Sequence, residues 1–184
     1  MASPADALLI ARVKAGDTTA FEGLVTRYKG LVFSAVTRIL ADKDAAGDVM
    51  QEAFIKAYSA LGKLEDTGAF KPWLLRIAAN EAFRYLKERR PELLADEPPA
   101  AQQPWAPPGG SPEETLGRKL TVANVERAIA KLPPTYRAAL ILRFYGHLAY
   151  KEIADSLGIT LANVKFRIHH GGRMLRAVLG REDE

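Results

Sequence analysis

Residues 150–170 of this 184-residue chain read YKEIADSLGITLANVKFRIHH and describe two short amphipathic helices separated by a tight turn. Gly158 can adopt the positive φ that ends the first helix. Thr160 can begin the second helix by accepting a hydrogen bond from a backbone N–H. The pattern predicts a helix-turn-helix, whose second helix fits the major groove of DNA. Its small core is expected to contain Ile153, Leu157, Ile159, Val164 and Ile168, and Ala154 is small where the two helices cross closely.

The second of these helices should leave a largely basic face outside the core. Its exposed side chains are expected to be Asn163, Lys165, Phe166, Arg167, His169, His170 and Arg173. This face suits binding to DNA. An ordinary amphipathic helix pair with a solvated basic face would show the same pattern, so the stretch alone leaves both interpretations open.

Composition limits the classes of protein to which the chain can belong. The sequence has no cysteine, which excludes disulfides, thiolate zinc sites and a cysteine nucleophile. Residues 116–184 carry 12 basic and 6 acidic side chains, a balance that suits a polyanionic partner. No apolar stretch approaches the roughly 18–20 residues that span a bilayer, and the N-terminus lacks the pattern of a signal peptide. We therefore expect a cytoplasmic protein without membrane insertion.

A proline-rich segment divides the chain. Residues 91–112 contain seven of the eleven prolines, so we expect neither helix nor sheet there. The predicted organisation is an N-terminal domain (1–90), an extended linker (91–115) and a C-terminal domain (116–184). Both domains are expected to be small and all-α, because no sustained period-two alternation occurs. The expected helices cover residues 5–15, 19–40, 43–61, 70–90, 116–131, 134–146, 150–157 and 161–178.

The helix expected over residues 70–90 carries a polar stripe beside its core face. Trp73, Arg76, Asn80, Arg84 and Lys87 follow one another at helical spacings and share one side. Cations can neutralise phosphates while aromatic and amide groups hold an unstacked base. The stripe therefore suits single-stranded or melting DNA, although a half-buried tryptophan beside a solvated basic face fits equally well.

The helix expected over residues 43–61 has an acidic exposed side, formed by Asp44, Asp48, Gln51, Glu52 and Ile55. An acidic patch with an exposed isoleucine repels nucleic acid and suits a basic protein surface. Taken alone, it would also suit a simple solvated face.

The sequence shows no catalytic constellation. His147, His169 and His170 are the three histidines, and no acid lies near the adjacent pair to complete a metal site. Neither a glycine-rich phosphate loop nor a nucleophile elbow occurs. We therefore expect no enzymatic activity, no metal, no cofactor and no small-molecule substrate.

Several motifs in order resemble those of the extracytoplasmic-function (ECF) sigma factors of the sigma-70 family. The N-terminal motifs are AFEGLVTRY (20–28), DVMQEAF (48–54) and FKPWLLRIAAN (70–80), which resemble the opening helix, the region 2 signature and the promoter-melting helix. The C-terminal motifs are LPPTYR (132–137), YKEIADSLG (150–158) and VKFRIH (164–169), which resemble region 4 and its recognition helix. Gly47, Pro72, Phe166 and Gly171-Gly172 depart from the family pattern.

The resemblance implies that the chain binds core RNA polymerase, directs it to promoter DNA and helps to open the −10 region. It also implies an anti-sigma factor as a partner. The implied polymerase-binding surface is Asp48, Gln51 and Glu52, with Asp44 and Ile55 on the same face. The implied −10 site combines Trp73, Arg76, Asn80, Arg84 and Lys87 with a loop for a flipped base at Asp66, Thr67 and Gly68. The implied −35 site is Thr160, Asn163, Lys165, Phe166, Arg167, His169, His170 and Arg173.

The main alternative is a stand-alone helix-turn-helix repressor or activator. Such a protein needs neither the acidic face nor the melting stripe, and these two features favour the sigma factor. A small helical enzyme is disfavoured by the missing catalytic groups. The resemblance further suggests that the linker lies in a basic channel of the polymerase, with Trp105 as its anchor.

Overall fold

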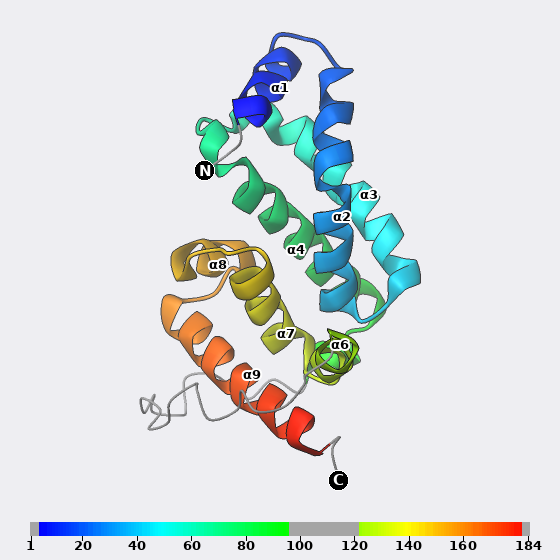
Figure 1. Ribbon diagram of the computed structural model, residues 1–184, viewed down its shortest axis with the longest axis vertical. Helices are drawn as coiled ribbons and strands as arrows, with labels where there is room; N and C mark the ends of the chain where they lie inside the picture. The colour runs from blue at the N-terminus through cyan, green and yellow to red at the C-terminus, as the bar shows by residue number, and fades with distance from the viewer. Residues whose placement is uncertain (1–3, 96–121, 182–184) are drawn as a thin grey trace.

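The computed structural model describes residues 4–95 and 122–181, and all regular structure within these ranges is helical (Figure 1). The first range contains α1 (Pro4–Lys14), α2 (Ala20–Leu40), α3 (Lys43–Ala60), α4 (Phe70–Arg89) and α5 (Glu92–Ala95), with short 3₁₀ turns at Leu61–Lys63 and Thr67–Ala69. The second contains α6 (Val122–Ala130), α7 (Pro134–Leu140), a π-helical turn (Ile141–Tyr145), α8 (Tyr150–Leu157) and α9 (Leu161–Arg181). The predicted all-α fold class is confirmed.

Short polar residues determine where the first helices begin. Asp17 Oδ1 accepts hydrogen bonds from the backbone N–H groups of Thr19 and Ala20, which starts α2. Asp42 Oδ1 accepts from the N–H groups of Asp44 and Ala45 and caps α3. These acceptors satisfy donors that a helix N-terminus leaves without intrahelical partners.

The helix boundaries differ from the sequence-based expectations at three places. Residues 92–95 form α5 although no helix was expected after Pro91, because a proline is tolerated in a first turn and the four residues that follow favour helix. The helix expected over 134–146 changes to π-helical geometry after Leu140. The last helix continues to Arg181, three residues beyond its predicted end. The remainder of the predicted linker, including Trp105, and the start of the helix expected at 116 lie outside the described residues.

The N-terminal helices pack around α4. Helix α4 contacts both α2 and α3, and it buries Phe70, Leu74 and Ala78 almost completely. Tyr28 of α2 lies edge-on to Phe70, with ring centroids 5.3 Å apart. The Tyr28 hydroxyl donates to Asp6 Oδ2 at 2.7 Å and thereby fastens α1 to α2. Burial and this carboxylate raise the pKa of Tyr28 to about 12.

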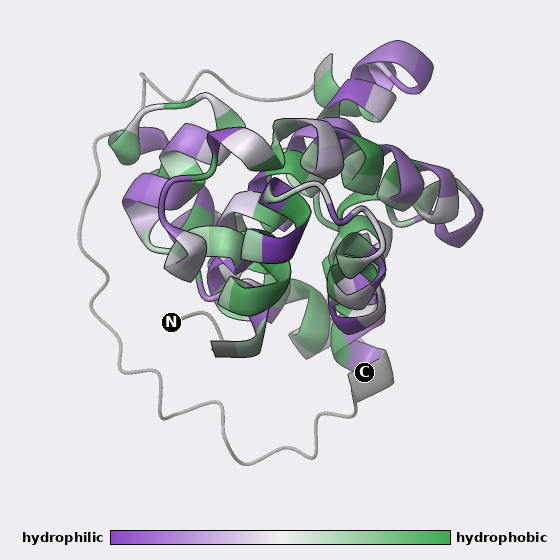
Figure 2. Cartoon of the chain, turned by 90° about the horizontal axis from the view of Figure 1, so that it is seen from above, coloured by the Kyte–Doolittle hydropathy of each residue, from purple (hydrophilic) through white to green (hydrophobic). Residues whose placement is uncertain are grey.

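The two halves of the chain pack against each other. Helix α2 contacts α6 and α7, and α4 contacts α8 (Figure 1). The buried apolar residues of both halves form one continuous core, and hydrophobic residues concentrate where the helices face one another (Figure 2). The sequence had indicated two domains but not this packing between them.

None of the helices in the described ranges is both long and apolar enough to span a membrane. Among the same residues, no group of three or more histidine or carboxylate side chains is arranged to hold a metal ion.

Candidate functional site

The helix-turn-helix has the geometry that its sequence predicts. Gly158 ends α8 with a φ of +64°, in the left-handed region. Thr160 Oγ1 accepts the N–H of Asn163 at 3.2 Å and caps the start of α9. Ile153 and Val164 are fully buried between the two helices. Glu152 Oε2 accepts the N–H of Ala149 at 2.6 Å, which fixes the beginning of α8.

Fewer side chains are exposed on the outer face of α9 than the sequence predicts. Thr160, Lys165 and Arg173 are exposed, while Asn163 and His169 are half-buried. The expectation that Arg167 is exposed is wrong, because its side chain is only 8% accessible. Residues 164, 167, 168 and 171 are all buried, and their spacing places them on one face of the helix. Arg167 is buried because it lies on this face, in spite of its charge.

Phe166 and His170 form an aromatic cluster with Tyr136 of α7. The rings of Phe166 and His170 stack at 10°, with centroids 5.3 Å apart, and both lie against Tyr136. Burial lowers the pKa of His170, and the nearby charges of Arg173 and His169 lower it further. Phe166 and His170 are therefore half-buried and held by neighbouring rings, in surroundings that favour the neutral form of His170.

The polar stripe of α4 occupies one exposed side of that helix. Arg76, Asn80 and Lys87 are exposed, and Trp73 is half-buried against Phe70, with ring centroids 5.8 Å apart. An unstacked base could meet Trp73 and Asn80 here, while Arg76 supplies a cation for a phosphate.

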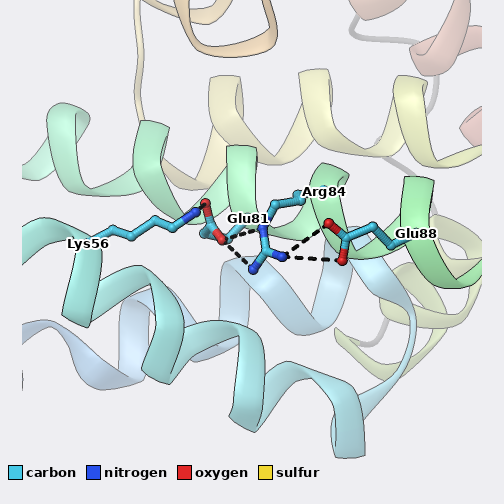
Figure 3. Close-up of polar contacts among 4 residues, drawn as sticks. All are labelled: Lys56, Glu81, Arg84 and Glu88. Carbon is cyan, nitrogen blue, oxygen red and sulfur yellow. Dashed lines mark hydrogen bonds and ion pairs between the residues drawn. The ribbon is translucent and has the colours of Figure 1, made fainter.

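Arg84 differs from the other cations of the stripe because two carboxylates hold it (Figure 3). Its guanidinium lies 2.8 Å from Glu81 and 3.2 Å from Glu88. Glu81 is buried and also pairs with Lys56 of α3 at 2.6 Å. Burial raises the pKa of Glu81, but the hydrogen bonds and charges of Lys56 and Arg84 outweigh this effect and lower it overall. The network joins α3 to α4 and compensates the charge of Arg84.

The predicted loop for a flipped base is ordered by its own carboxylate. Asp66 Oδ1 accepts the N–H of Gly68 at 2.7 Å and caps the 3₁₀ turn Thr67–Ala69. Asp66, Thr67 and Gly68 line a cleft of about 700 Å³, whose walls also include His147 and Glu152 from the C-terminal half.

All five residues predicted for the acidic side of α3 are exposed, namely Asp44, Asp48, Gln51, Glu52 and Ile55. Beside them, an apolar groove of about 510 Å³ runs between α2 and α3. Phe21, Phe54 and Tyr58 line this groove, and the Phe21 and Tyr58 rings meet edge to face with centroids 5.1 Å apart. The groove was not predicted from the sequence. The signal that could have indicated it is the presence of Phe21 in α2 and of Phe54 and Tyr58 in α3.

Comparisons with known proteins agree with this arrangement. The sigma-70 region 2 family model matches residues 24–92, and the sigma-70 region 4 model matches residues 123–175. The RNA polymerase sigma-H factor of Pseudomonas aeruginosa is 37% identical over 169 residues, covering 89% of this chain and 88% of that protein. The chain belongs to the ECF sigma factors of the sigma-70 family.

A further relative and two solved structures are similar to this sigma factor. The ECF sigma factor SigW of Bacillus subtilis is 31% identical, with 92% of this chain and 94% of that protein covered. CnrH, solved in complex with the cytosolic domain of CnrY, matches at 25% identity with a TM-score of 0.65, covering 96% of this chain and 98% of that chain. The sigma factor RpoE of Bartonella quintana, solved with the anti-sigma factor NepR, shares the fold at 19% identity, with a TM-score of 0.64 over 87% of this chain and 96% of that chain. As a member of the family, the protein is an RNA polymerase sigma factor that acts in transcription initiation.

Proposed function

We propose that this sigma factor divides its work among three surfaces. The acidic side of α3, Asp44, Asp48, Gln51, Glu52 and Ile55, binds core RNA polymerase. The stripe of α4 and the loop at residues 66–68 read and open the −10 region. The outer face of α9, centred on Lys165 and Arg173, reads the −35 region.

The observation that supports this division most strongly is the exposure of the whole acidic side of α3 beside an apolar groove. Ile55 is 52% exposed and Tyr58 is 42% exposed, and both line the groove, so they form part of a contiguous apolar patch of the kind that marks protein-binding sites. Carboxylates beside an apolar groove suit a basic protein helix that carries an apolar side chain, and they repel DNA. A stand-alone repressor would have no use for such a surface.

The C-terminal half supports duplex recognition. Lys165 and Arg173 are exposed cations on a helix whose start is capped at Thr160 and which packs on α8 in a helix-turn-helix. Phe166 and His170 are held by Tyr136 and contribute a fixed apolar surface rather than mobile side chains. The buried Arg167 positions α9 from within and is assigned no contact with bases.

The proposed partners follow from these surfaces. They are core polymerase, promoter DNA and an anti-sigma protein that competes for one of the surfaces, and the proposed place of action is the cytoplasm. Neither a cofactor nor a small-molecule substrate is part of the proposal.

Gel shifts with and without core polymerase test the proposal. Because two modest DNA-binding surfaces must act on one scaffold, we expect weak binding of promoter duplex by the free protein and tight, specific binding once polymerase is added. Tight, specific binding by the free protein would favour a stand-alone repressor or activator.

A further inference from the structure

Two carboxylates of very different exposure hold the guanidinium of Arg84 (Figure 3). The Nε and Nη2 atoms of Arg84 lie 2.9 and 2.8 Å from Glu81 Oε2, and the Glu81 side chain is 6% exposed. The Nη1 atom lies 3.2 Å from both carboxylate oxygens of Glu88, whose side chain is 55% exposed. The two partners therefore differ in how easily another anion could replace them on Arg84.

Glu81 is the fixed partner. Its second oxygen, Oε1, accepts a hydrogen bond of 2.6 Å from Lys56 Nζ of α3. Charge-assisted hydrogen bonds of this length are among the strong ones, and a buried carboxylate that lost a cation would keep an uncompensated charge. Glu81 therefore stays on Arg84 and restricts the conformations that the Arg84 side chain can adopt.

Glu88 is the exchangeable partner. It follows Arg84 by four residues, and an exposed ion pair at this spacing changes an equilibrium constant by only about twofold. Arg84 is itself exposed, so a ligand in solution can approach its Nη1 edge. A backbone phosphate carries a full charge and oxygens that match the guanidinium geometry. Such a phosphate can take the place of Glu88 without disturbing the bonds to Glu81.

The position of Arg84 makes a phosphate of the −10 strand the fitting anion. Arg84 lies four residues after Asn80 and eight after Arg76, so helical spacing places all three on one exposed side of α4. A strand with an unstacked base at Asn80 would lay its backbone along this side.

The charges around Arg84 determine how strongly it attracts that backbone. Lys56 and Arg84 are balanced by Glu81 and Glu88, so these four side chains have no net charge together. When Glu88 moves away, the remaining three carry one net positive charge. Glu88 therefore opposes binding of a phosphate at Arg84, whereas Glu81 prepares Arg84 for it.

We propose that Arg84 binds a backbone phosphate of the −10 strand, that Glu81 is the positioning residue that orients Arg84, and that Glu88 is a competing carboxylate which the phosphate displaces. The inference rests on the proposed role of α4 in reading the −10 region. It adds that two carboxylates on one guanidinium act on DNA binding with opposite signs.

Binding of single-stranded DNA to the reconstituted holoenzyme tests these signs. The probe is the labelled non-template −10 strand of a promoter that the holoenzyme transcribes, and fluorescence anisotropy measures its affinity. Glu88→Gln should raise the affinity about twofold, because the competitor is lost. Glu81→Gln should lower it about threefold, because Arg84 must then be ordered on binding.

The shared change in charge provides the control for these two variants. Both remove one negative charge, so a general effect of charge would strengthen DNA binding in both. Glu92→Gln removes the same charge from the exposed start of α5 and should leave the affinity nearly unchanged. Stronger binding by Glu81→Gln, or a gain in Glu92→Gln equal to that in Glu88→Gln, would overturn the proposal.

Replacement of single phosphates tests the contact itself. Each phosphate of the −10 strand is exchanged in turn for an uncharged methylphosphonate. At one position the exchange should weaken binding to the wild-type holoenzyme about tenfold, the loss of one hydrogen-bonded charge pair, and should have little effect with Arg84→Ala. If wild type and Arg84→Ala respond alike at every position, Arg84 does not bind a phosphate.

Lys56→Gln separates positioning from a merely structural role of Glu81. It removes the other cation of Glu81 and one link between α3 and α4, but it leaves the pair of Glu81 with Arg84 in place. The methylphosphonate effect should stay near tenfold in Lys56→Gln and fall to about threefold in Glu81→Gln. An equal fall in both variants would show that Glu81 acts only through the stability of the fold.

Two further variants separate this inference from the proposed function. If Asn80→Ala weakens binding of the −10 strand and Arg84→Ala does not, the phosphate contact is wrong while the assignment of α4 stands. If neither Asn80→Ala nor Arg76→Ala changes the affinity, the assignment of α4 fails, and the inference about Arg84 fails with it.

Discussion

The guanidinium of Arg137 in α7 donates two hydrogen bonds, of 2.7 and 3.0 Å, to the carbonyl oxygen of Ile39 at the end of α2. Arg137 is only 3% exposed, and burial lowers its pKa to about 10, which leaves it charged at neutral pH. A buried charge is tolerated only where hydrogen bonds compensate for lost hydration. Here the compensation comes from two backbone carbonyls, and one of them belongs to the other half of the chain.

We therefore predict that Arg137→Ala lowers the free energy of unfolding by about 2–4 kcal/mol, because it leaves the Ile39 and Ala130 carbonyls without this donor. Chemical denaturation followed by circular dichroism measures the change. Arg127→Ala is the control, because exposed Arg127 donates a hydrogen bond of 2.8 Å to Asn124 of its own helix α6. Equal effects of the two substitutions would contradict the importance of the buried contact.

The ion pairs of Glu81 with Lys56 and Arg84 should make the free energy of unfolding depend on pH in the acid range. Since the folded-state pKa of Glu81 lies below its ordinary value of 4.5, its contribution is complete above about pH 4.5 and disappears as the pH falls through the folded-state value. Glu81→Gln should cost about 1–2 kcal/mol at pH 7 and progressively less in acid. Glu65→Gln, at an exposed position, should change stability by less than about 0.5 kcal/mol. If the free energy of unfolding of Glu81→Gln differed from that of the wild type by the same amount at every pH, the ion pairs would not be the source of the stability.

The adjacent glycines of α9 should respond differently to substitution. A Cβ on Gly171 would lie 3.2 Å from Leu140 Cδ1 and 3.3 Å from Tyr136 Cβ, whereas one on Gly172 has no neighbour within 4 Å. Both alanine variants gain similar helix propensity, so their difference reports the close packing of α9 on α7. Thermal unfolding should show Gly171→Ala to be less stable than Gly172→Ala by about 1–3 kcal/mol. The reverse order would show that α7 and α9 are not this close.

Substitutions on the two proposed DNA-reading surfaces should impair different steps of transcription initiation. Asn80→Ala should impair promoter opening, and its defect should shrink on a template already mismatched at −10, because flipped bases are read only after melting. Lys165→Ala should impair binding to duplex and gain little from the mismatch, because its helix reads the intact major groove. Open-complex formation on matched and mismatched templates measures both effects. Equal rescue of the two variants would contradict this division.

The helix-turn-helix could be predicted from the sequence, because Gly158 and Thr160 determine the end of α8 and the start of α9 through local interactions. So could the acidic side of α3, where all five expected residues are exposed. The burial of Arg167 was missed because residue type was weighed above helical spacing. The packing of α8 on α4 could not be predicted, since contacts such as Arg137 with Ile39 join residues far apart in the chain and leave no local pattern.

Charge reversal on α3 should disrupt polymerase binding. Asp48→Arg with Glu52→Arg places two cations against a partner expected to be basic, which should weaken binding at least about 100-fold, since like-charge contacts cost several kcal/mol. Co-purification with core polymerase measures this loss. Glu22→Arg with Glu92→Arg makes the same change in net charge at exposed positions outside the proposed surface. Normal co-purification of the Asp48 and Glu52 variant would show that the interface lies elsewhere.

Run-off transcription by core polymerase on a promoter library tests whether the protein initiates transcription through the acidic side of α3. Transcripts from defined start sites should require the wild-type protein, persist with Glu22→Arg plus Glu92→Arg, and vanish with Asp48→Arg plus Glu52→Arg. Transcription that does not depend on the protein, or that continues unchanged with the reversed α3 surface, would contradict this prediction.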